Sequence, residues 1–204
     1  TINVTGVGFE PKGEFLSEGN RIDPKEDAQL QMILRISKMC NDSVLKEGEW
    51  KIIGDPTEGA LKVLAKKAHF EEDCPRVKEI PFSSERKIMS TVHDIKGNYI
   101  AYAKGAPEFM LRCCNKMYPN KELTKKERDT ITRTIHELAD DGLRVLGFAY
   151  KKLGMRYSVD SVERDMTFVG LVAVMDPTRK ETKAAIKLCR EAGIKVVMLT
   201  GDHQ

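Results

Sequence analysis

Hydrophobic and polar residues alternate with a strand-like period in several parts of this chain. Residues 2–9 alternate as in a short strand, and a turn through Gly13 follows. Residues 87–93 and 99–104 flank Gly97-Asn98, a dipeptide typical of tight turns, so we expect them to pair as a hairpin. Residues 144–150 form a further candidate strand.

Helical spacing appears between these strands, and each helix has a recognisable start. Asp23-Pro24 and Asp55-Pro56 each offer a capping carboxylate followed by a proline suited to the first helical position. Thr124 with Glu127 has the spacing of a capping box, and Gly142 suits a helix stop. Hairpins mixed with helices predict an α+β fold with an antiparallel sheet flanked by helices.

The pattern changes near residues 162–170. Residues 168–175 are continuously apolar, residues 177–192 have helical spacing, and residues 194–199 are apolar again. Strand, helix and strand in that order, with both strands apolar on both faces, predict a buried parallel βαβ unit of Rossmann-like type. We therefore expect one domain over residues 1–165 and part of a second, α/β domain over residues 166–204.

Charge and composition exclude some classes of function. The 204 residues include 34 Lys and Arg against 31 Asp and Glu, a formal net charge of +3, without a basic run of five residues. Nucleic-acid binders normally show a one-sided basic excess, so we expect no nucleic-acid partner. The five cysteines include no C-x-x-C pair and the four histidines are scattered, which indicates a reduced chain without a zinc site.

The chain also contains no apolar run of roughly 20 residues, the length that crosses a bilayer. We expect the chain itself to be soluble. It opens at Thr1 and stops after an apolar run, so we interpret it as a segment of a longer protein.

Neither of the two common nucleotide-binding signatures, G-x-x-x-x-G-K-[ST] or G-x-G-x-x-G, is present. A nucleotide site would have to combine an aromatic face for the base with Lys or Arg for the phosphates. Four short stretches offer such groups, and they cover residues 54–58, 82–87, 104–108 and 142–144.

Each of these groups also has a structural explanation. Phe82 can be a core residue, and Glu58 can complete a capping box that starts at Asp55. Lys87 and Arg144 can be surface cations, and Lys104 can neutralise a nearby acid.

Thr200-Gly201-Asp202 stands at the carboxyl end of a predicted parallel strand, where open α/β sheets place their ligands. A hydroxyl, an uncovered backbone N–H and a carboxylate suit a phosphoryl group and its Mg²⁺.

These stretches, together with others in the same order, resemble the large cytoplasmic region of P-type cation-transporting ATPases, most closely the calcium-pump-like branch. The matching stretches span nearly the whole chain: VTGVGFEPKGEF (4–15), GDPTEGAL (54–61), FSSERKIMS (82–90), YAKGAPE (102–108), DGLRVLGFAY (141–150), DPTRKET (176–182) and REAGIKVVMLTGD (190–202).

The resemblance implies a role for individual residues around ATP. It implies that Phe82 stacks on adenine, Glu58 hydrogen-bonds the base and Lys104 lines the same pocket. It implies that Lys87 and Arg144 face the phosphates. The implied nucleotide-binding set is Glu58, Phe82, Lys87, Met89, Lys104, Gly105, Arg144, Leu146, Asp176 and Arg179, with Met89 and Leu146 as pocket walls.

On the phosphate side, the resemblance implies that Thr200, Gly201 and Asp202 contact the transferred phosphate and its Mg²⁺, with Asp202 as the metal ligand. Asp176 and Arg179 would belong to a hinge and phosphate-facing loop. The cofactors implied are ATP and Mg²⁺.

The chain departs from the family pattern in a few places. Calcium pumps often carry Arg where this chain has Ser84, which removes one possible phosphate contact. Many relatives have two prolines where Pro177-Thr178 stands. The D-K-T-G-T segment with the phosphorylated aspartate, and the later segment with the catalytic Lys and further Asp residues, are absent.

The sequence therefore predicts a nucleotide-binding domain followed by part of a phosphorylation domain, on the cytoplasmic side of a membrane pump. The parent would form an aspartyl phosphate and transport a cation, working with the remaining phosphorylation domain, an actuator domain and transmembrane domains. Branch resemblance implies Ca²⁺, with magnesium, proton or sodium/potassium transport as competitors. A haloacid-dehalogenase-type phosphatase and a non-catalytic nucleotide-binding or interaction module stay open as alternatives.

Overall fold

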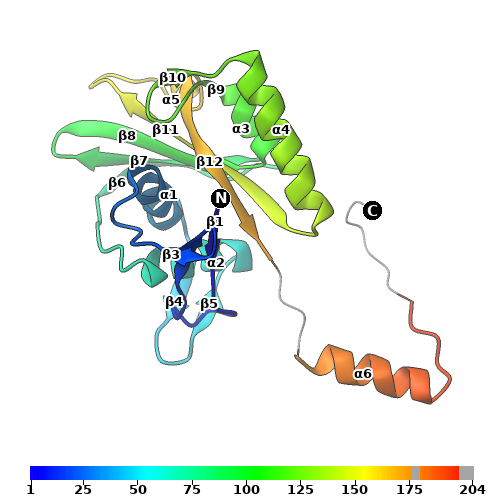
Figure 1. The fold of residues 1–204 in the computed structure, drawn as a ribbon. Coiled ribbons are helices and arrows are strands. Elements are labelled where there is room, and N and C mark those ends of the chain that lie inside the picture. The colour runs from blue at the N-terminus through cyan, green and yellow to red at the C-terminus, as the bar shows by residue number, and fades with distance from the viewer. Residues whose placement is uncertain (176–179, 198–204) are drawn as a thin grey trace.

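A computed structural model describes residues 1–175 and 180–197 of the chain, and a seven-stranded sheet is the centre of this part (Figure 1). The strand order is β10 (Lys121–Glu122), β9 (Cys114–Met117), β12 (Met166–Val174), β11 (Arg144–Leu153), β8 (Asn98–Gly105), β7 (Ile88–Ile95) and β6 (Arg76–Ile80). Neighbouring strands are antiparallel except β12 and β9, which are parallel. The predicted antiparallel sheet flanked by helices is confirmed.

Helices cover both faces of this sheet (Figure 1). On one face, α1 (Ala28–Met39) and α2 (Pro56–Lys67) pack against alternate residues of the strands, among them Tyr102 and Phe148. On the other face, α3 (Pro107–Cys113) and α4 (Lys125–Asp140) pack against the intervening residues, such as Ala101 and Ala103. The alternation of side chains along β8 therefore assigns each residue to one face.

Two smaller sheets lie beside α1 and α2. The strands β1 (Ile2–Val4), β2 (Phe15–Ser17) and β3 (Asn20–Arg21) form one, and β4 (Val44–Lys46) and β5 (Lys51–Ile53) form the other. A separate apolar cluster that includes Phe15, Leu34 and Phe70 joins the first of them to the helices. The strand predicted over residues 2–9 is thus shorter than expected.

The predicted helix starts are confirmed for α2 and α4 and differ for α1. Asp55 accepts a hydrogen bond from the backbone N–H of Glu58, with Pro56 in the first turn, and Thr124 begins α4 with a complete capping box. The helix expected from Asp23-Pro24 begins at Ala28 instead, because Asp27 is the residue whose carboxylate caps two backbone N–H groups.

The end of the described chain differs from the predicted βαβ unit. The apolar run at 168–175 forms β12, an inner strand that pairs antiparallel with β11, and residues 194–197 are not in a strand. After the short helix α5 (Val159–Val162) and β12, the helix α6 (Lys180–Glu191) lies apart from the sheet (Figure 1). A continuous apolar run does not specify its partner, so β12 is equally compatible with either sheet.

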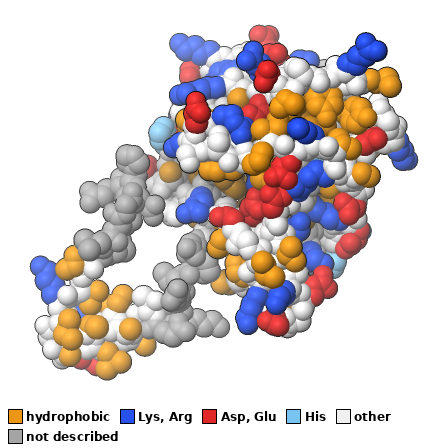
Figure 2. All heavy atoms as spheres, turned by 180° about the vertical axis from the view of Figure 1, so that it is seen from behind, with side chains coloured by type: hydrophobic (Ala, Val, Ile, Leu, Met, Phe, Trp, Pro, Cys, Tyr) orange, Lys and Arg blue, Asp and Glu red, His pale blue; other side chains and the backbone are white. Residues whose placement is uncertain are grey.

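The surface carries charges of both signs. Figure 2 shows acidic and basic side chains interspersed over one face of the main body, and hydrophobic side chains exposed on α6. Leu188 of α6 is one of the exposed apolar residues. None of the described helices is both long and apolar enough to cross a membrane.

Candidate nucleotide-binding site

The strand register brings five of the predicted site residues to one end of the sheet, namely Met89, Lys104, Gly105, Arg144 and Leu146. Met89 at the start of β7 lies opposite Lys104 at the end of β8, and Lys104 lies opposite Phe148 on β11. Leu146 and Arg144 precede Phe148 on the same strand. We call this region, together with the N-terminus of α2, the α2 end of the sheet.

A largely buried ion pair joins the sheet to α2 at this end. The ammonium of Lys104 donates to Glu58 Oε1 at 2.8 Å, and the two side chains are 7% and 17% exposed. Glu58 Oε2 accepts the backbone N–H of Asp42 at 3.0 Å. Glu58 therefore does not close a capping box with Asp55, and Lys104 neutralises an acid as its structural explanation predicted.

The Glu58 carboxylate keeps capacity for a ligand despite these two bonds. An ionised carboxylate has about four lone-pair sites, and Lys104 and Asp42 occupy two of them. The Lys104 ammonium has three donors, of which the ion pair uses one. The pair can thus hold its geometry and still form hydrogen bonds to a bound molecule.

Arg144 contacts Thr57, the residue before Glu58 in the first turn of α2. Its Nη1 donates to the hydroxyl of Thr57 at 2.9 Å, which attaches the start of β11 to the first turn of α2. In the sheet Arg144 is in register with Val174, the last residue of β12. A cation therefore lies where the chain leaves the sheet.

Phe82 lies on the loop 81–87 between β6 and β7, and its side chain is 60% exposed. Its structural explanation as a core residue is therefore wrong. The backbone N–H of Ala106 donates to the carbonyl of Lys87 at 2.9 Å, so the end of this loop is attached directly beside the end of β8.

Lys87 is not brought to the Lys104–Glu58 pair. Its φ is +53°, and its ammonium lies 5.7 Å from the ring centre of Phe109 on α3, which covers the opposite face of the sheet. Its position as an exposed cation agrees with its structural explanation.

Gly105 permits the close approach of β7 and β8. A Cβ placed on Gly105 would lie 2.3 Å from the carbonyl oxygen of Lys87, a distance that no side chain tolerates. Beneath this point Met89 is 4% exposed and packs with Tyr102 and Phe148, while Leu146 is partly buried beside them. Met89 and Leu146 supply an apolar base for the α2 end.

One thiol lies under the site. Cys40 is buried, donates to the carbonyl of Met89 at 3.5 Å, and burial raises its pKa to about 11. A thiol that remains protonated at neutral pH is a poor nucleophile, so Cys40 is a packing residue here.

The predicted residues Asp176, Arg179, Thr200, Gly201 and Asp202 lie outside the described residues. Within residues 1–175 and 180–197, no group of three or more His, Cys, Asp or Glu side chains is arranged to hold a metal ion.

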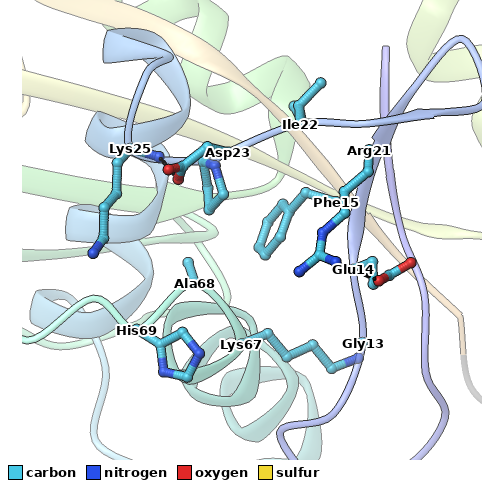
Figure 3. Close-up of a pocket in the computed structure, with 11 residues that line it drawn as sticks. Gly13, Glu14, Phe15, Arg21, Ile22, Asp23, Lys25, Lys67, Ala68 and His69 are labelled. Carbon is cyan, nitrogen blue, oxygen red and sulfur yellow. Dashed lines mark hydrogen bonds and ion pairs between the residues drawn. The ribbon is translucent and has the colours of Figure 1, made fainter.

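Two hollows in the described surface are lined by residues other than Lys104, Glu58 and Arg144. The first lies between the β1–β3 sheet and the C-terminus of α2. The ring of Phe15 faces into it, and Lys67 extends toward Gly13 (Figure 3). Lys67 there donates to the backbone carbonyls of Thr5 and Gly6. The second lies between β6, α3 and α5 and includes Arg86 and Glu163.

Sequence reasoning missed two carboxylates that support the site. Asp42 donates its backbone N–H to Glu58 and accepts from Arg76, while Glu163 accepts from Arg86. Each partner is 16 to 77 residues away in the chain. Periodicity reports which face a residue occupies but not which distant residue it meets, so the pattern carried no signal for these contacts.

Comparisons with known proteins show the family of the chain. The model of the family described as "P-type ATPase, cytoplasmic domain N" matches residues 29–181. A calcium-transporting ATPase of Bacillus subtilis is 38% identical over 217 residues, covering 100% of this chain and 24% of that protein. A cation-transporting ATPase of Synechocystis is 38% identical and covers 98% and 24%. A sodium/potassium exporting P-type ATPase of Schizosaccharomyces pombe is 39% identical and covers 93% and 20%.

The chain thus spans about a quarter of the length of the curated relatives that it matches. The family match includes α2, β7, β8 and β11, which form the α2 end of the sheet, and also the loop 81–87. The chain belongs to the P-type ATPase family and contains its cytoplasmic domain N.

Proposed function

We propose that this chain binds ATP at the α2 end of the sheet, as the nucleotide-binding part of a cation-transporting pump. The observation that carries the proposal is the Lys104–Glu58 pair, which places a charged donor and a carboxylate with free lone pairs beside the loop that bears exposed Phe82. An exposed aromatic ring is available to stack on a base, and the nearby ion pair offers donors and acceptors for its edge.

The adenine base would stack on Phe82. Base–aromatic stacking contributes about 1–3 kcal/mol and tolerates any base, so it supplies affinity rather than selectivity. Glu58 would supply selectivity, because its carboxylate accepts a hydrogen bond from the exocyclic amine of adenine, where guanine presents an oxygen. Met89 and Leu146 would support the base from below.

The phosphates would extend from this pocket toward Arg144. A guanidinium binds phosphate oxygens well, and Arg144 lies where β12 leads toward the residues proposed to face the transferred phosphate. These are Asp176, Arg179, Thr200, Gly201 and Asp202, with Asp202 as the ligand of ATP-bound Mg²⁺. Lys87 would join only after leaving the ring of Phe109, which costs about 0.5–1 kcal/mol at an exposed site.

In the parent protein, we propose, the bound ATP phosphorylates an aspartate in the adjoining domain, and the aspartyl phosphate drives cation transport across a membrane. The relatives' names include calcium, unspecified cation and sodium/potassium transport, and three calcium-transporting relatives support Ca²⁺. The partners would be the rest of the phosphorylation domain, an actuator domain and transmembrane domains.

We also propose that residues 1–165 form the nucleotide-binding domain and that residues 166–204 begin the phosphorylation domain. Because β12 is an inner strand of the large sheet, the connection between the two domains would begin as a strand paired within the first domain and continue into the second.

A calorimetric titration of the chain with ATP, repeated with GTP and with Lys104→Ala, tests the proposed function. We expect saturable ATP binding, weaker GTP binding, and a loss of affinity in the variant. Equal binding of ATP and GTP would contradict the role of Glu58. No binding at millimolar ATP would favour a non-catalytic interaction module.

A further inference from the structure

Arg86, a residue of the loop 81–87, attaches this loop to Glu163 by hydrogen bonds and an ion pair. Its Nη1 lies 2.7 Å from each carboxylate oxygen of Glu163, and its Nη2 donates to the carbonyl of Pro81 at the start of the loop. The backbone N–H of Arg86 also donates to the hydroxyl of Ser83. One guanidinium therefore attaches the loop on both sides of Phe82 to a residue 77 positions away.

Glu163 is itself held by three neighbouring elements. It follows α5, and the adjacent Val162 is fully buried in the core. The ammonium of Lys151 on β11 donates to the carbonyls of Ser161 and Arg164, which flank Glu163 closely in the chain, at 2.8 and 2.7 Å. The hydroxyl of Ser90 on β7 donates to Glu163 Oε1 at 2.6 Å.

This arrangement places Arg86 away from the proposed phosphate side. Arg86 and Glu163 lie in the hollow between β6, α3 and α5, and their side chains are 35% and 15% exposed. Arg144, in contrast, bonds to Thr57 at the N-terminus of α2. Arg86 has its hydrogen bonds directed to the loop and to Glu163, so its contacts are those of a structural clamp.

We propose that Glu163, acting through Arg86, is a positioning residue that keeps the loop 81–87 in the conformation in which Phe82 receives the nucleotide base. The proposal rests on the proposed function of the α2 end. A loop ordered before binding spares the ligand the conformational entropy of ordering it, so the clamp raises affinity without touching the nucleotide.

The most informative variants keep the charge or the shape of the side chain and remove the hydrogen bonds between Arg86 and Glu163. Arg86→Lys keeps the positive charge, but an ammonium cannot reproduce the planar fork that reaches Glu163 and Pro81 together. Glu163→Gln keeps the shape and can still accept from Ser90. Arg35→Lys and Glu72→Gln are matched controls, because Arg35 and Glu72 form an ion pair that joins α1 to the segment after α2.

The experiment is a titration of each folded variant with ATP and with inorganic tripolyphosphate, after circular dichroism has verified the fold. Arg86→Lys and Glu163→Gln should weaken ATP binding roughly three- to tenfold, a part of the stacking contribution, and leave tripolyphosphate binding unchanged. The control variants should change neither. In a Phe82→Ala background, Glu163→Gln should change ATP affinity by less than about twofold, because the contributions of coupled residues are not additive.

Three results would overturn the proposal. One is wild-type ATP affinity in both variants. The second is an equal loss of ATP and tripolyphosphate affinity, which would make Arg86 a phosphate ligand. The third is a loss of ATP affinity caused by Glu163→Gln that is as large in the Phe82→Ala background as in the wild-type chain. Failure of the wild-type chain to bind ATP would overturn the proposed function as well, so the two failures are distinguishable.

Discussion

At the scale of single residues, the site depends on charged groups that are held by partners in other elements. Glu58 accepts from Lys104 of β8 and from the N–H of Asp42, and Arg144 donates to the hydroxyl of Thr57 on α2. The sequence predicted that Lys104 meets either an acid or a ligand, and the structure supplies the acid. It could not predict that the acid is Glu58, because 46 residues separate the two.

Replacement of Lys104 by Met should destabilise the fold by about 2–4 kcal/mol, because it leaves the largely buried Glu58 carboxylate without its counter-ion. Adding Glu58→Gln to Lys104→Met should restore part of this loss, since no buried charge then remains unpaired. Urea unfolding measures both free energies. A double variant less stable than the single one would show that the pair is not coupled in this way.

His93 predicts a pH dependence of stability. It is 2% exposed, with Nδ1 donating to the carbonyl of Cys74 and Nε2 accepting from Thr91, and burial with help from nearby Arg76 lowers its pKa below the ordinary 6.5. As pH falls through 6.5 the unfolded chain binds the proton first, so the free energy of unfolding should fall, by at most about 1.4 kcal/mol per pH unit.

This contribution is fully present above pH 6.5 and is lost progressively below it, down to the pKa of His93 in the folded state. Urea unfolding between pH 5 and 7.5 measures it. His93→Gln should flatten the profile, whereas His136→Gln, at an exposed helical position, should not. Identical profiles for wild type and His93→Gln would assign the dependence to other groups.

At the scale of elements, local signals predicted the helix starts of α2 and α4 and the β7–β8 hairpin, because capping residues and turns act over a few positions. They failed at the start of α1, where two aspartates compete for the cap, and at β12, where an apolar run did not reveal its antiparallel partner. The elements that form the α2 end are those with the strongest local signals.

The contact between β7 and β8 at Gly105 can be tested directly. Gly105→Ala should destabilise the fold by about 1–3 kcal/mol and weaken ATP binding, because the new methyl group would displace the carbonyl of Lys87 and the loop attached to it. Gly154→Ala, where a Cβ would lie no closer than 4.0 Å to its nearest neighbour, the carbonyl oxygen of Arg156, is the control and should stay within about 0.5 kcal/mol of wild type. Unfolding free energies and ATP titrations of the two variants measure the difference, and equal behaviour would contradict the close approach.

At the scale of the whole molecule, two kinds of inference contribute to the candidate site. Family resemblance predicted the set of residues, and the register of β7, β8 and β11 explains how Met89, Lys104 and Leu146 come together. Lys87 is a predicted residue that this register does not bring to the pair: its φ is positive, and its ammonium lies over the ring of Phe109. No periodic pattern anticipates a single residue of that conformation.

The central claim is that an adenine nucleotide binds at the α2 end of the sheet, and amide chemical-shift mapping of the ¹⁵N-labelled chain with ATP tests it most directly. We predict that the shifts that change with ATP concentration cluster at Thr57–Glu58, the loop 81–87, Lys104–Gly105 and Arg144. Amides around the hollow of Figure 3 should stay unchanged and serve as the internal control. Changes confined to that hollow, or no saturable change at millimolar ATP, would contradict the account.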